Sequence, residues 1–133
     1  MAERVRSGWE LRSRAEIEYM LAHLVRVYAP THDYARGGAA VCRWILGHDH
    51  ASPVTGQFLG RPVTCNDVRH EGYEAQVAMS NGGRPAVSPP VDPLSINYLN
   101  GVDDWALWVT GGQGVSIPDD WPFDQGPPLG SVR

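Results

Sequence analysis

Apolar residues recur at intervals of three and four between Ser13 and Pro30. The positions are Ile17, Met20, Leu21, Leu24, Val25 and Tyr28. In an α-helix this spacing places all of them on one stripe, opposite a polar face. Ser13 and Glu16 have the spacing of a capping box, in which the serine hydroxyl accepts a backbone N–H and the glutamate reaches back to the cap. The pattern therefore predicts an amphipathic helix that begins at Ser13 and ends before Pro30.

A second helix is predicted over residues 34–46, with an apolar face that consists of Tyr34, Gly38, Val41, Cys42 and Ile45. Thr31 or Asp33 would cap its start, and Gly47 suits the left-handed position that closes a helix. The small residues 37–40 allow close backbone approach, so we expect this face to pack against the first helix. The short connection predicts an antiparallel helical hairpin over residues 13–47.

Residues 48–93 are predicted to be mixed and loop-rich. An extended segment over 57–65 is interrupted by Gly60 and Pro62. Residues 67–80 fit either an alternating strand or a helix, and we favour a helix that ends at Asn81-Gly82-Gly83. The four prolines between residues 83 and 93 predict a loop.

The last third predicts strands. Leu94, Ile96 and Tyr98 alternate with polar residues, and Asn100-Gly101 is typical of a type I′ turn into a second strand over 104–110. This favours a β-hairpin within 94–117, followed by a proline-rich tail over 118–133. The alternative is a helix capped by Asp92 with Pro93 in its first turn. The predicted fold is thus a single α+β domain over residues 1–133, with an N-terminal helical hairpin, a small β-hairpin and an extended tail.

Composition restricts the partners. The net charge is -4, and the stretch from residue 85 onward carries six Asp against Arg133 alone. Without a basic stripe to displace counterions, nucleic acid is not an expected partner, whereas a basic protein surface is. No apolar run approaches the roughly 20 residues that cross a bilayer, so no membrane partner is expected. Two cysteines and no apolar leader predict a cytoplasmic protein with reduced thiols.

Histidines and a carboxylate cluster after the second predicted helix. His48, Asp49 and His50, with His70 as an outside ligand, could bind zinc, because imidazoles two residues apart in an extended stretch point to one side. His32 cannot join them, since the intervening helix separates it from His48 by roughly 20 Å. The alternative is a solvated turn in which the imidazoles complement the helix C-terminus.

The tail combines aromatic and acidic residues. Trp121 and Phe123 offer large apolar area to a partner's groove, flanked by Asp119, Asp120 and Asp124. In the alternative, the tail folds back and an aromatic side chain fills this domain's own core.

These patterns contain no complete set of catalytic residues, and we therefore expect no catalytic role and no cofactor. The hypothesis is a non-enzymatic interaction or assembly protein, such as an accessory protein of a phage or mobile element, that binds another protein or its own copies through the acidic aromatic region. A metal-binding domain or metal-dependent hydrolase centred on His48, Asp49 and His50 is the alternative. A small-ligand module lined by Trp105 and Trp108 is a third class.

Overall fold

The computed structural model describes residues 11–85, 93–112 and 115–123, and these residues contain four α-helices. They are α1 (Arg14–Val27), α2 (Asp33–Leu46), α3 (Cys65–Met79) and α4 (Ile96–Val109). The described residues contain no strand, only an isolated antiparallel bridge between Ala51 and Phe58. The predicted α+β class and the extended segment over 57–65 are therefore wrong. No described helix is both long enough and apolar enough to cross a membrane.

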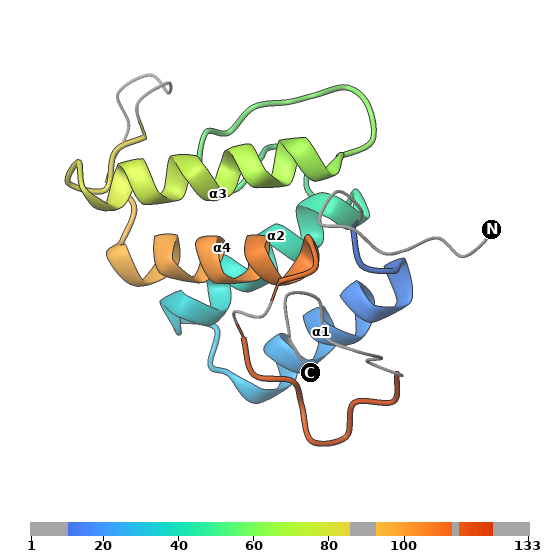
Figure 1. Ribbon diagram of the computed structural model, residues 1–133. Coiled ribbons are helices and arrows are strands. Elements are labelled where there is room, and N and C mark those ends of the chain that lie inside the picture. Colours follow the sequence, from blue (N-terminus) through green and yellow to red (C-terminus); the bar gives the residue numbers. More distant parts are fainter. Residues whose placement is uncertain (1–10, 86–92, 113–114, 124–133) are drawn as a thin grey trace.

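The helices pack in the succession α1, α2, α4, α3 rather than in chain order. In Figure 1, α3 lies alongside α4, and α2 crosses behind α4. Helix α1 packs against α2. The core between them is built from the apolar faces of all four helices and includes the fully buried Ile17, Met20, Val41, Val68, Leu99, Val102, Trp108 and Val109.

Helix α1 confirms the predicted capping box. The Ser13 hydroxyl accepts the Glu16 N–H at 3.1 Å, and the Glu16 carboxylate accepts the Ser13 N–H at 3.1 Å. Ile17, Met20 and Leu24 face the core as predicted. Val25 is 64% exposed, so the buried stripe of α1 is narrower than the sequence indicates; α2 is the helix that contacts α1 most.

Helix α2 confirms the second predicted helix, but its cap is His32 rather than Thr31 or Asp33. The imidazole Nδ1 of His32 accepts the Ala35 N–H at 3.3 Å. Gly47 closes the helix in the left-handed conformation with φ 85°, as predicted. The small-residue run was expected to face α1, yet a Cβ built on Gly37 would lie 2.2 Å from the Tyr98 carbonyl oxygen, so Gly37 faces α4.

Helix α4 occupies the region predicted as a β-hairpin, which is wrong. Ser95 caps it by accepting the Tyr98 N–H at 3.0 Å. The alternative of a helix is right for this region, but its predicted start is wrong, because the cap is Ser95 instead of Asp92 and Pro93 precedes the first turn. Gly101 was assigned to a turn, but it is buried inside the helix, and a Cβ there would lie 2.0 Å from the Tyr34 carbonyl oxygen. The glycine thus serves close helix packing instead of a positive φ.

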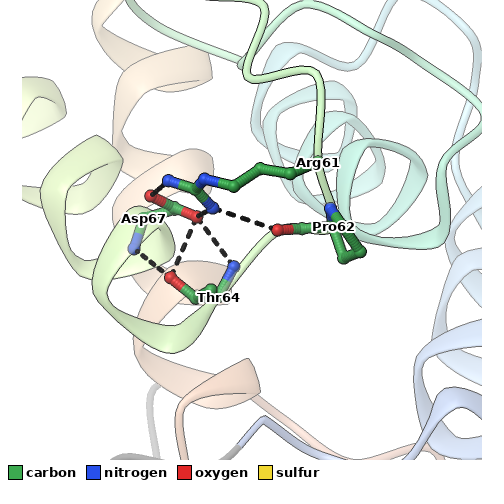
Figure 2. A network of polar contacts seen from close by, with 4 residues as sticks. All are labelled: Arg61, Pro62, Thr64 and Asp67. Atoms are coloured by element: carbon green, nitrogen blue, oxygen red, sulfur yellow. Dashed lines mark hydrogen bonds and ion pairs between the residues drawn. The ribbon is translucent and has the colours of Figure 1, made fainter.

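Helix α3 confirms the helical interpretation of residues 67–80. Its N-terminus carries a second capping box, in which the Asp67 carboxylate accepts from the Thr64 N–H at 2.8 Å and from the Thr64 hydroxyl at 2.9 Å (Figure 2). Arg61 donates to the same carboxylate at 2.6 and 3.0 Å. The guanidinium holds the pKa of Asp67 well below its usual range, helped by the Thr64 hydrogen bonds.

Candidate functional site

Residues 115–123 fold back on the helices instead of extending away. The Trp121 ring makes edge contacts with Tyr19 of α1 and Trp108 of α4, at centroid distances of 5.4 and 5.9 Å. Phe123 packs on Trp121 at 5.0 Å, and the Tyr19 hydroxyl donates to the Asp120 carbonyl at 3.1 Å. Trp121 therefore packs partly buried on its own core, which is the alternative that the sequence left open.

Arg12 forms the other side of this contact. Its guanidinium lies 4.5 Å from the centroid of the buried Trp108 ring, and its Nε donates to the Trp108 carbonyl at 2.6 Å. A cation at the C-terminus of α4 complements the negative end of the helix dipole. Trp121 thus anchors residues 118–123, called here the acidic segment, to the Trp108 ring, against which Arg12 also packs.

The acidic segment exposes its charged side chains. Asp119, Asp120 and Pro122 are exposed, while Phe123 is partly buried. Desolvation and the neighbouring Asp120 raise the pKa of the Tyr19 hydroxyl above its ordinary value. Asp124, also predicted to bind a partner, lies outside the described residues. Partner binding by the acidic segment stays a prediction.

A hollow of about 340 Å³, called here the Trp105 hollow, lies next to the acidic segment. Met20, His23 and Leu24 of α1 form one side of it. Tyr28, at the C-terminus of α1, adds to this side. The other walls come from the start of α2, from α4 and from residues 115–119, and include Tyr34, Trp105, Val115, Ser116, Ile117, Pro118 and Asp119. The hollow is therefore lined by aromatic and apolar side chains, with a carboxylate among them.

Polar groups around the Trp105 hollow divide into satisfied and unsatisfied ones. The Tyr34 hydroxyl donates to the Asp104 carboxylate, and burial together with this bond raises the pKa of Tyr34 far above its ordinary value. By contrast, the Nδ1 atom of His23 and the Nε1 atom of Trp105 are buried and have no hydrogen-bond partner among the described residues. Buried polar atoms are rarely left so, and each such atom requires an explanation.

The predicted metal ligands are not gathered into one set. His48 is exposed, the Asp49 carboxylate accepts from Arg43 Nε at 3.1 Å, and the His50 ring lies 5.9 Å from that of Phe58. His70 lies on α3, with its Nε2 atom 3.8 Å from Glu74. In the part of the chain that the structure describes, no group of three or more His, Cys, Asp or Glu is placed to hold a metal ion. The zinc site stays a prediction.

Glu71 is a polar residue that sequence reasoning missed. Its carboxylate is 2% exposed. It accepts the N–H groups of Val54 and Thr55 at 2.7 and 3.1 Å, and the Thr55 hydroxyl at 2.6 Å. The signal was present, because Glu71 falls on the same helical face as Val68 and Ala75. This carboxylate fixes the loop between α2 and α3 and has a structural role.

The residues of the Trp105 hollow were only partly foreseen. Trp105 was singled out for ligand binding together with Trp108, but Trp108 lies beneath Trp121 and Arg12 instead. His23 and Tyr34 carried no sequence signal for such a site, because only the packing of α1, α2 and α4 brings them together.

Comparisons of this chain with protein-family models, with curated proteins and with solved structures find no match.

Proposed function

We propose that the protein is a non-enzymatic interaction domain that binds a basic surface of another protein through the acidic segment. The observation that carries this proposal is the anchoring of the segment by Trp121. With the indole packed on Tyr19 and Trp108, Asp119 and Asp120 lie exposed on the surface of the domain.

This arrangement assigns different tasks to the aromatic and acidic residues. Trp121 orders the segment before any partner arrives, which lowers the entropy lost on binding. The two carboxylates then select and steer a basic surface, since complementary charge accelerates encounter and disfavours acidic partners. Pro122 and the partly buried Phe123 add apolar area beside the charges.

The experiment compares Asp119→Asn/Asp120→Asn with a control that has the same change of charge, Asp33→Asn/Asp49→Asn, at the two ends of α2. Each full-length protein is used for affinity capture with quantitative mass spectrometry, and its mass is measured by light scattering. We expect the Asp119→Asn/Asp120→Asn variant to capture at least tenfold less of the proteins that both the wild type and the control capture. Added salt should reduce the amount that the wild type captures in the same way.

Equal capture by both pairs would contradict the proposal. A change in oligomeric mass of the first pair alone, without any change in captured proteins, would also contradict it, because it would identify a second copy as the occupant.

A further inference from the structure

A second hollow, of about 200 Å³, lies where α2, the first turn of α4 and the loop after α2 meet, and is called here the arginine hollow. It is lined by Arg36, Ala40, Arg43, Asp49, Ala51, Ser52, Pro53 and Tyr98. None of these residues belongs to the acidic segment, so a ligand here is independent of the proposed protein partner. Pockets for drug-sized ligands begin at about 300 Å³, and this hollow therefore suits a smaller molecule.

The arginine hollow follows from the spacing of residues along α2. Arg36, Ala40 and Arg43 are four and three residues apart, which places them on one face of the helix. Ala40 carries only a methyl group and leaves space between the two longer side chains. Tyr98 supplies a wall, because its ring centroid lies 5.7 Å from Arg36 Cζ and its hydroxyl donates to the Pro53 carbonyl at 2.8 Å. Burial raises the pKa of Tyr98 to about 12, and the charges of Arg36 and Arg43 oppose this rise, so both cations act on the same wall.

Both guanidinium groups have hydrogen-bond donors that solvent can reach. The side chains of Arg36 and Arg43 are 54% and 39% exposed. Arg36 Nη1 donates to Asp33 at 2.8 Å, and Arg43 Nε donates to Asp49 at 3.1 Å. The Nε and Nη2 atoms of Arg36 and both Nη atoms of Arg43 have no hydrogen-bond partner among the described residues. A guanidinium donates but never accepts, so the partners that these atoms lack are acceptors.

The charge of the lining favours an anion. Arg36 and Arg43 face Asp49 alone among the lining residues, which gives the hollow a net positive charge in a chain of net charge -4. The planar fork of an arginine binds two oxygens of a carboxylate or a phosphate. A single carboxylate has oxygens for one fork only, whereas a phosphate monoester or a dicarboxylate has oxygens for both.

We propose that the arginine hollow binds a small dianion whose oxygens accept from Arg36 and Arg43 at once. A phosphate monoester and a short dicarboxylate share this chemistry, and methyl phosphate and succinate are their simplest probes. Acetate presents a single carboxylate, and succinamide has the shape of succinate without its charge.

The test is a titration of the full-length ¹⁵N-labelled protein at pH 7.5, followed through the backbone amide resonances of Ala40 and Ala51. Ionic strength is held constant, because salt screens exposed charges. We expect at least one of the two dianions to shift these resonances saturably with a Kd on the order of 1 mM. Tighter binding of methyl phosphate would identify a phosphoryl ligand, and tighter binding of succinate a dicarboxylate. Acetate and succinamide should bind at least tenfold more weakly than the better dianion.

Four variants of solvent-reachable side chains test the assigned charges. Arg36→Gln and Arg43→Gln should each weaken binding of the dianion at least fivefold. Asp49→Asn should strengthen it at least threefold, because it removes the carboxylate from the lining and releases Arg43 Nε. The control is Arg14→Gln, which removes the same charge from a surface ion pair with Glu18 on α1, away from the hollow, and should leave the Kd within twofold of the wild type.

Absence of a saturable shift with both dianions would overturn the proposal, as would acetate binding as tightly as either of them. An equal loss in Arg14→Gln would also overturn it, because the ions would then respond only to the overall charge of the protein. Unchanged or weaker binding by Asp49→Asn would contradict the assigned lining, and a misfolded variant could not imitate the expected gain.

Discussion

Replacing Glu71 by alanine tests whether one buried carboxylate holds the loop between α2 and α3. The side chain is 2% exposed and accepts the N–H groups of Val54 and Thr55 and the Thr55 hydroxyl. In Glu71→Ala the two N–H groups lose this acceptor in a buried environment, whereas the Thr55 hydroxyl keeps Ser52 at 2.9 Å. A buried donor without a partner costs roughly 1–3 kcal/mol, so two of them predict a loss of about 2–6 kcal/mol.

The assay is urea denaturation at pH 7, which gives the free energy of unfolding. Glu71→Gln retains one acceptor oxygen for the two N–H groups and should lose only about 1–2 kcal/mol. The control is Glu74→Gln on the same helix. Glu74 is 4% exposed, and its Oε1 atom has no partner among the described residues, so removing its charge should leave stability unchanged or raise it. A loss below about 1 kcal/mol for Glu71→Ala, or an equal loss for Glu74→Gln, would refute the reasoning.

Three further predictions concern helix contacts and ionisation. Gly101→Ala places a methyl group 2.0 Å from a carbonyl of α2, and should cost about 3 kcal/mol in the same denaturation assay; Gly47→Ala, with open space but a φ of 85°, should cost about 1 kcal/mol. Because Arg61 lowers the folded-state pKa of Asp67, their pair stabilises the protein above about pH 4, and this contribution is lost on further acidification. In Asp67→Asn the unfolding midpoint should therefore fall less between neutral and acidic pH than in the wild type. An equal fall of the midpoint in both proteins would contradict the prediction. Burial raises the pKa of the Cys42 thiol to about 12. Cys42 should therefore react with a thiol reagent at pH 8 only as fast as the protein unfolds, and rapid labelling of Cys42 in the folded protein would contradict this.

The first two helices were predictable because local and periodic signals agree there. Ser13 and Glu16 form a complete cap, and Gly47 marks a helix end by its backbone conformation. Each of these features acts within one turn of chain, so a sequence displays it directly.

The fourth helix was missed because two short signals outweighed a longer one. Alternation over Leu94, Ile96 and Tyr98 covers too few residues to separate a strand from a helix. Its core positions, Leu99, Val102, Ala106 and Val109, recur at three and four residues, as in a helix. Asn100-Gly101 imitates a turn because glycine is also selected where two backbones touch, and sequence alone does not distinguish these roles.

The candidate sites depended on contacts between distant parts of the chain. The return of Trp121 to Tyr19 spans about a hundred residues, and the Trp105 hollow requires three helices and a loop to meet. Composition drew attention to Trp105, Trp121 and the acidic residues. Their surroundings follow only from the packing.

The close approach of α2 and α4 at Gly37 and Gly101 also indicates how relatives of this chain could be recognised. A side chain at either position would push two backbones apart, and no neighbouring side chain could yield to relieve the pressure. Evolutionary drift at these two sites should therefore be confined to the smallest residues and should be correlated between them. A pair of glycines 64 positions apart would then identify distant homologues better than the acidic segment, whose exposed side chains can change without disturbing the helix packing.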